Sequence, residues 1–265
     1  MTRPMTAATL RRSPATEPMT QRLFTSALFA GLSAGLIAVL LQFFLMEPLI
    51  LEGEEYESGA KVHFAGILDR STEEPTSDGH THATEAEASD GHAHPEADED
   101  LTARFALAFF ATFVAWVGYG LLMVAGFALA NHFGIAVAPK EALLWGVAGF
   151  VSFQLMPGLG LSPELPGVPA ADLQARQLWW VGTAVATIAA LALFAYGRGV
   201  VFIAIGVGLL IAPHLIGAPR LNEFLGTAPP GLAAEFVTHS MVVGMAAWVV
   251  LGLAAGYFWN RPQAA

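Results

Sequence analysis

The chain has 265 residues, of which 55% are hydrophobic and only 13% are charged, and its formal net charge is −10. Soluble domains carry roughly 25% charged residues, so this deficit predicts that lipid covers much of the surface. The absence of cysteine excludes disulfides and thiolate metal sites. Sixteen of the 22 acidic residues lie between Glu47 and Asp100, and no basic patch is present, so nucleic acid is not expected as a partner.

The N-terminal region predicts a short tail followed by a membrane helix. Residues 1–22 are rich in Thr, Pro and Arg and are expected to form a disordered cytoplasmic tail, with Met19 as an alternative start. The apolar run Leu23–Met46 has 24 residues. The competing interpretation is a signal peptide, but the run is too long for a signal-peptide core. We therefore predict a retained transmembrane helix. Gly31 and Gly35 form a GxxxG motif that permits close helix contact.

A long polar segment interrupts the apolar sequence. Glu47 to Asp100 is acidic and contains few large apolar residues. Too little apolar surface is present to offset the cost of ordering it, so it is expected to be disordered. We therefore predict a transmembrane domain over 23–261, interrupted by an extracytoplasmic loop over 47–103 that is rich in His and acidic residues.

Five further apolar runs follow, and each is close to the ~20 residues that cross a bilayer. Only Gly197-Arg198-Gly199 separates the run Leu178–Tyr196 from the run Val200–Ile216, so these two runs could also form one hairpin that does not fully span the membrane. We predict an all-α, polytopic membrane helix bundle of six transmembrane helices, with five as the alternative. The five runs are Phe105–Ala130, Leu143–Leu161, Leu178–Tyr196, Val200–Ile216 and Phe236–Trp259.

The stretch Phe150–Trp180 is the best pointer to a working site. It begins in apolar sequence, breaks at Met156-Pro157-Gly158, and returns to apolar sequence at Trp179. Proline removes a backbone donor and ends regular helix. At membrane depth, irregular backbone survives only where it is buried in protein or lines a wet cavity.

The distribution of Lys and Arg predicts that both termini are cytoplasmic. With the N-terminus inside, seven basic residues lie on the cytoplasmic side and five outside. The inner set is Arg3, Arg11, Arg12, Arg22, Lys140, Arg198 and Arg261, and the outer set is Lys61, Arg70, Arg104, Arg176 and Arg220.

The acidic loop contains a duplicated His-x-His pattern that could capture a metal ion. In an extended chain, residues i and i+2 project to the same side about 6.5–7 Å apart, and imidazole suits zinc, copper, nickel and cobalt. The alternative is a solvated acidic loop whose histidines are incidental. The loop histidines proposed as ligands are His63, His80, His82, His92 and His94.

Further polar residues fall at the predicted outer ends of the helices, on the same side as this loop. Ionisable residues within membrane helices are rare and often mark pathways. Taken singly, each has a structural alternative, such as an interfacial position or a bond between helices. We expect Arg176 and Arg220 to pair with Asp172 and Glu223. The predicted metal ligands at this outer mouth are Glu47, Glu164, His214 and His239, with Gln154, Met156 and Gln177 beside them.

The sequence lacks the motifs of the common enzyme classes. It contains no Walker loop, no HExxH and no GxSxG. We therefore expect neither an enzyme nor a resident cofactor.

Several motifs together resemble the CbtA family, predicted cobalt transporter subunits of bacterial inner membranes. The resemblance covers about Met19 to Arg261 and includes the long middle motif. It implies uptake of cobalt, often with CbtB, a small single-span partner that carries its own histidines. It supplies no ligand set to carry over. The motifs are Glu47-Pro48-Leu49-Ile50-Leu51, Ala142-Leu143-Leu144-Trp145-Gly146, Pro157 to Gly167, Ala170 to Trp180 and Ala212 to Pro219.

The sequence as a whole predicts a permease, or permease subunit, of the bacterial inner membrane. Its expected cargo is Co²⁺, with Ni²⁺ and Zn²⁺ as alternatives because affinity orders alone do not favour cobalt. Its expected partners are the lipid bilayer, the metal cation and a CbtB-like subunit. The alternative function is a membrane-bound accessory or sensor protein that binds metal without transporting it.

Overall fold

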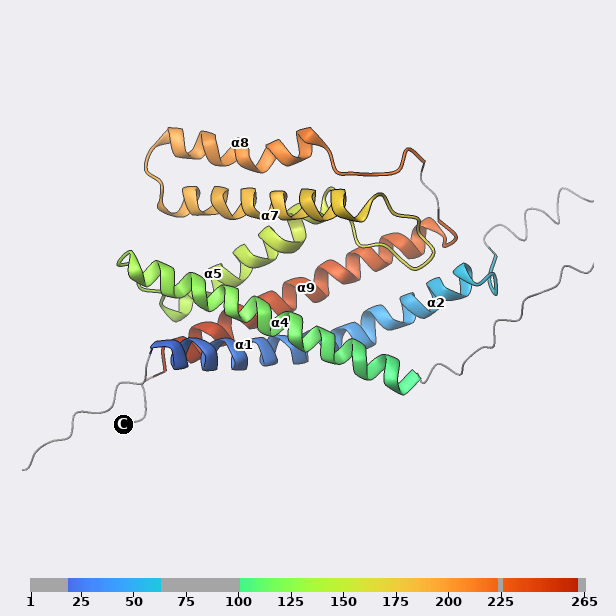
Figure 1. Cartoon of the computed structure of the whole chain (residues 1–265), viewed down its shortest axis with the longest axis horizontal. Helices are drawn as coiled ribbons and strands as arrows, with labels where there is room; N and C mark the ends of the chain where they lie inside the picture. Colours follow the sequence, from blue (N-terminus) through green and yellow to red (C-terminus); the bar gives the residue numbers. More distant parts are fainter. Residues whose placement is uncertain (1–18, 63–100, 224–225, 262–265) are drawn as a thin grey trace, which may run out of the picture.

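A computed structural model of the chain describes residues 19–62, 101–223 and 226–261. The regular elements of the described part are all helices, and it contains no strand. Figure 1 shows its long helices running back and forth along one axis, so that both ends of the described chain lie at the same end of the bundle. The helical elements are α1 (Met19–Leu41), the π-helix η1 (Gln42–Met46), α2 (Glu47–Glu57), α4 (Leu101–His132), α5 (Pro139–Phe150), the π-helix η3 (Val151–Leu155), α6 (Met156–Gly158), α7 (Leu173–Tyr196), α8 (Val200–Ile216) and α9 (Pro230–Trp259).

The helix lengths and compositions are those of a multi-pass membrane protein. Within the described residues, four helical stretches are long and apolar enough to cross a membrane: Met19–Glu57, Ala103–His132, Leu173–Tyr196 and Pro230–Trp259. Helix α8 is also apolar but shorter, with 17 residues. The predicted all-α membrane bundle is therefore confirmed.

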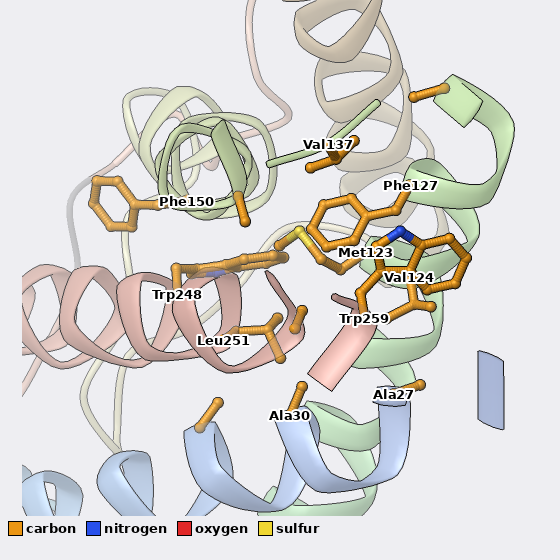
Figure 2. Packing of buried hydrophobic residues seen from close by; sticks show 14 residues of the cluster. Ala27, Ala30, Met123, Val124, Phe127, Val137, Phe150, Trp248, Leu251 and Trp259 are labelled. Carbon is orange, nitrogen blue, oxygen red and sulfur yellow. The ribbon is translucent and has the colours of Figure 1, made fainter. Parts of the chain in front are cut away.

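The bundle core lies where α9 packs between α1, α4 and α5. Figure 2 shows Leu251 of α9 beside Ala30 of α1, whereas Trp248 lies on the side of α9 toward Phe150. Phe127 of α4 belongs to the same cluster, and alanine on α1 leaves room for the larger side chains opposite it. Because lipid is as apolar as these side chains, close packing rather than the hydrophobic effect holds such helices together.

Small residues set the closest helix contacts. A Cβ on Gly31 would lie 2.5 Å from the Cα of Val117, so the predicted GxxxG motif is confirmed as the contact between α1 and α4. The same device joins α5 to α9, where a Cβ on Gly252 would lie 2.8 Å from the Cα of Gly146. Helices α7 and α8 form a separate antiparallel pair at the side of the bundle (Figure 1).

Both π-helices precede a proline by the same spacing. Pro48 and Pro157 each come two residues after the end of their π-helix. A proline inside a helix lacks an N–H and clashes with the carbonyl four residues earlier. A π-helix accommodates this disruption within a continuing helix, and such elements are frequent at functional sites.

Two predicted boundaries at the start of the chain were wrong. Residues 19–22 were expected in the tail but form the first turn of α1. The first helix was expected to end at Met46, whereas η1 carries it into α2, which ends at Glu57. The helix therefore continues past Glu47, although the sequence becomes polar there. The rest of the predicted tail and residues 63–100 of the predicted loop lie outside the described residues.

Candidate functional site

The predicted break after the third apolar run is present. Helix α6 ends at Gly158, and the next regular element, α7, begins at Leu173. Residues 159–172 thus form an irregular segment, which we call the broken segment. Asp172 closes it by accepting a hydrogen bond from the N–H of Ala175 at 2.8 Å, which caps α7.

Several contacts hold the broken segment in place. Arg220 donates two hydrogen bonds to the carbonyl oxygen of Gly160, at 3.0 and 2.8 Å. A Cβ on Gly160 would lie 2.2 Å from the indole of Trp179, so only glycine fits there. Leu165 is 4% exposed and packs in a second apolar cluster with Leu49 of α2 and Phe236 of α9. The segment is therefore irregular and also well anchored.

A pocket of about 610 Å³ opens between the broken segment, η3, α7 and α9. Its wall combines apolar and aromatic side chains with a small number of polar groups, the usual make-up of a binding site. The polar lining residues are Gln154, Ser162, Glu164, Arg176 and Gln177, and among the apolar ones are Phe153, Trp180 and Met241.

An ion pair lies in the wall of this pocket. The Nη2 of Arg176 donates to the Oε2 of Glu164 at 2.8 Å, and the two side chains are 24% and 35% exposed. The predicted pairing of Arg176 with Asp172 is therefore wrong, because Asp172 serves as the cap of α7. Arg220 likewise bonds to the Gly160 carbonyl rather than to Glu223.

Gln154 connects the pocket to α9. Its Nε2 donates to the carbonyl oxygen of Ser240 at 3.1 Å. A Cβ on Gly244 would lie 1.9 Å from the Gln154 side-chain oxygen, so the amide lies in a notch that only glycine leaves open. The amide is thus fixed in position, and its oxygen has no hydrogen bond within the described residues.

His239 lies in α9 but contacts the other π-helix. Its Nδ1 is 2.9 Å from the carbonyl oxygen of Leu45 in η1. A carbonyl can only accept, so Nδ1 carries the hydrogen and Nε2 of a neutral ring keeps its lone pair. Metal-binding histidines commonly donate their other ring N–H to a carbonyl in this way. Glu47 follows Leu45 by two residues and is partly buried.

His214 lies apart from both places, in the last turn of α8. Its ring meets that of Trp179 edge-on, with centroids 5.8 Å apart, and the Trp179 indole donates to the carbonyl of Pro213 at 3.0 Å. The Nε2 of His214 is buried and has no hydrogen-bond partner in the described part of the chain.

The structure therefore brings together only part of the predicted outer mouth. Glu164 meets Gln154 and Gln177 in the pocket, whereas His239 and Glu47 lie beside η1 and His214 lies against α7. Among the described residues, no three His, Asp or Glu side chains lie close enough to hold a metal ion. The other predicted ligands, His63, His80, His82, His92 and His94, lie outside the described residues.

Sequence reasoning missed Met241 as a lining residue and proposed Met156, which does not line the pocket. The available signal was the pair of small residues Ser240 and Gly244, which lie one turn apart on α9 and receive the Gln154 side chain. That pair marks the face of α9 toward η3, and Met241 adjoins it.

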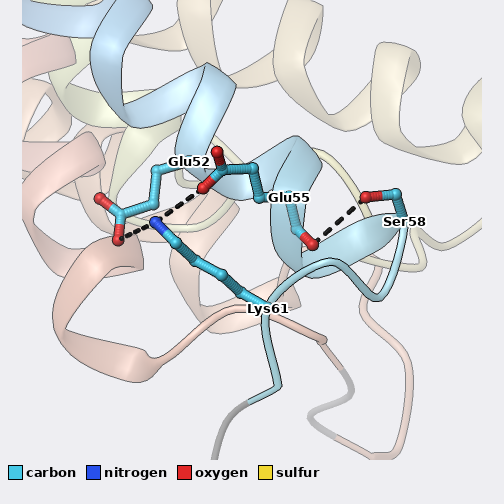
Figure 3. Close-up of polar contacts among 4 residues, drawn as sticks. All are labelled: Glu52, Glu55, Ser58 and Lys61. Carbon is cyan, nitrogen blue, oxygen red and sulfur yellow. Dashed lines mark hydrogen bonds and ion pairs between the residues drawn. The ribbon is translucent and has the colours of Figure 1, made fainter.

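The end of the bundle nearest the pocket is acidic. Figure 3 shows Lys61 between two carboxylates of α2, with its Nζ 3.4 Å from Glu52 and 2.6 Å from Glu55. The hydrogen bond to Glu55 raises the pKa of Lys61 above its usual 10.5. Arg104 of α4 pairs with Glu54 in the same region.

The two ends of the bundle differ in charge. In the described part of the chain, the end that holds both termini carries four basic residues and one acidic residue: Arg22, Lys140, Arg198, Arg261 and Glu141. The opposite end carries four basic and nine acidic residues: Lys61, Arg104, Arg176, Arg220, Glu47, Glu52, Glu54, Glu55, Glu57, Glu164, Asp172, Glu223 and Glu235.

Long apolar helices define a polytopic helical membrane protein, and a pocket with a few polar groups lies beside its broken segment. A family comparison makes the assignment more specific. The chain belongs to the CbtA family, whose model is described as "Probable cobalt transporter subunit" and matches residues 20–260. The resemblance seen in the sequence is thereby confirmed. No curated protein and no solved structure matches the chain.

Proposed function

We propose that this chain is the permease subunit that carries Co²⁺ into the cell across the bacterial inner membrane. The observation that carries the proposal is the distance over which the pocket extends along the bundle. Met241, which lines it, is the twelfth of the 30 residues of α9. At ~1.5 Å per residue, that position is roughly 18 Å along the helix, whereas Glu164 belongs to the segment outside the helices. The pocket thus leads from the acidic end toward the middle of the bundle.

The donor groups in the pocket suit partial dehydration of a divalent ion. Glu164 offers carboxylate oxygens, Gln154 and Gln177 offer amide oxygens, and Met241 offers a soft thioether. Oxygen donors alone would suit magnesium or calcium, and sulfur shifts the preference toward transition metals. Nickel and zinc remain alternatives on this chemistry, and cobalt follows from the family.

The charge difference between the two ends supports an orientation with both termini in the cytoplasm, because basic residues favour that side. The acidic end then faces outward and attracts cations toward the pocket. The histidines of the loop, His80, His82, His92 and His94, would add a capture site above it. A divalent cation moving inward gains about 4.6 kcal/mol per 100 mV of membrane potential.

The family description calls these proteins subunits, which makes partner chains plausible. In this proposal a CbtB-like single-span protein completes the transporter. The peripheral pair α7 and α8 offers apolar surface that lipid or such a helix would cover.

A second candidate function is a membrane-bound protein that binds or delivers metal without transporting it. The ion pair favours this alternative, because Arg176 already neutralises Glu164 and metal would then bind the loop histidines rather than enter the pocket. The two functions differ in whether metal enters the cell.

Radiolabelled cobalt uptake distinguishes them, in cells that lack their own cobalt importers and express the chain with or without a CbtB-like partner. We expect uptake by the wild type, loss in Glu164→Gln, and no change in Glu235→Gln, an exposed carboxylate of α9 at the same end. Absence of uptake with and without the partner, despite membrane insertion, would favour the accessory function.

A further inference from the structure

We propose that Arg176 is an exchangeable counter-ion of the pocket: its guanidinium occupies Glu164 when no metal is bound and gives way when a divalent cation binds. This inference rests on the proposed function, because it assigns the pocket to a cation. It adds a residue that controls how tightly the cation is held and how readily it leaves.

The geometry of the pair is that of a replaceable contact. One hydrogen bond joins Nη2 of Arg176 to Oε2 of Glu164, and no second bond between them forms the two-pronged arrangement typical of strong Arg–carboxylate pairs. Both side chains line the pocket and both are partly exposed. A cation in the pocket therefore reaches the carboxylate without unfolding anything around it.

The pair is not needed to hold the broken segment. Leu165, the next residue after Glu164, is anchored in the second apolar cluster. Gly160 is held by Arg220, and Asp172 caps α7. These contacts fix the segment on both sides of Glu164, so the ion pair is free to serve the pocket.

The charge balance explains why a cation site would contain an arginine. Glu164 and Arg176 are the charged residues of the pocket wall, and together they sum to zero. Without the arginine, the carboxylate and the other donors of the pocket would hold a divalent ion more tightly and release it more slowly. Arginine keeps its proton at all physiological pH values, so it returns to the carboxylate as the metal departs and lowers the cost of release.

The proposal predicts opposite effects for the two partners. Glu164→Gln should weaken cobalt binding, whereas Arg176→Gln should strengthen it. At about 4 Å in water, the repulsion between a divalent ion and a guanidinium corresponds to roughly 30-fold in affinity. In transport, Arg176→Gln should lower both KM and kcat, because the metal binds tightly but leaves slowly. A purely structural tether predicts instead that both variants bind cobalt more weakly.

The test is calorimetric titration of Co²⁺ into the purified full chain in lipid nanodiscs, with His80, His82, His92 and His94 replaced by alanine in every sample. Arg104→Gln is the matched control, because Arg104 also pairs with a glutamate at the acidic end but does not line the pocket.

We expect Arg176→Gln to bind at least about tenfold more tightly, Glu164→Gln to bind at least about tenfold more weakly, and Arg104→Gln to match the parent. Arg176→Leu, which adds no donor atom to the pocket, repeats the measurement if Arg176→Gln does not fold. Unchanged or weaker binding in the variants that lack the Arg176 charge would overturn the proposal, as would failure of both Arg176 variants to fold. Tighter binding of Co²⁺ in the Arg176 variant by a protein that does not transport cobalt would support the counter-ion role of Arg176 and contradict the proposed permease function.

Discussion

The crossing of α5 and α9 positions the pocket, and a single methyl group should disturb it. An added Cβ on Gly252 would lie 2.6 Å from the carbonyl oxygen of Ala142 and 2.8 Å from the Cα of Gly146. Both are backbone atoms, so no side chain can move aside. Relief to an ordinary 3.4 Å contact requires the two helices to separate by about 0.8 Å (3.4 minus 2.6).

A gap of this size removes a quarter to a half of the dispersion energy of the atoms that line it. Overpacking of this kind costs about 1–3 kcal/mol. Alanine also gains roughly 0.5–1 kcal/mol over glycine in a helix, which would mask part of the loss. Gly208 of α8 is the matched control, since nothing lies within 4 Å of its added Cβ. The comparison of the two alanine variants cancels the propensity gain.

The assay is unfolding of each purified variant in detergent, followed by the fluorescence of its six tryptophans, among which Trp248 and Trp259 lie in the core. We expect Gly252→Ala to unfold with about 1–3 kcal/mol less stability than Gly208→Ala. It should also transport less cobalt, because η3 continues directly from α5 into the pocket. Equal stability of the two variants would refute the close backbone crossing.

Three further predictions test other parts of the account. Deleting residues 78–94 should lower uptake at scarce cobalt and leave it near normal at high cobalt, as measured by uptake curves; loss at every concentration would place the loop in the permeation path. His239→Phe removes the hydrogen bond to the Leu45 carbonyl, so it should cost about 1–3 kcal/mol of stability. It should also reduce cobalt uptake at every cobalt level, and unchanged uptake would exclude His239 from the permeation path. Arg220→Gln removes two bonds to Gly160 and should speed hydrogen exchange in residues 159–172, where an unchanged exchange rate would contradict the anchoring role of Arg220.

Apolar pattern predicted the helices well where glycine also marked their ends. Helix α8 begins and ends at Val200 and Ile216 as predicted, and it is flanked by Gly199 and Gly217, both with positive φ. The first helix lacked such a marker. Its apolar run stops at Met46, but hydrogen bonding continues through η1 into a polar helix, because polarity does not prevent a helix from extending beyond the membrane.

The candidate site was predicted less completely. The break close to Pro157 was visible in the sequence because proline acts locally, and the number of apolar runs before Glu164 placed this residue at the end of the bundle opposite both termini. The ion pair between Arg176 and Glu164 was not visible in the sequence, because Arg176 lies near both Asp172 and Glu164 in the chain. The position of Asp172 immediately before a helix was a capping signal, and it would have left Glu164 as the partner.

Transport by the purified chain tests the central claim most directly. The protein, alone or with a CbtB-like partner, would be reconstituted into sealed vesicles with an inside-negative potential, and cobalt in the lumen would be measured. The account predicts accumulation that grows with the potential and is lost in Glu164→Gln. Cobalt bound to the protein without accumulation in the lumen, with the partner present, would contradict it.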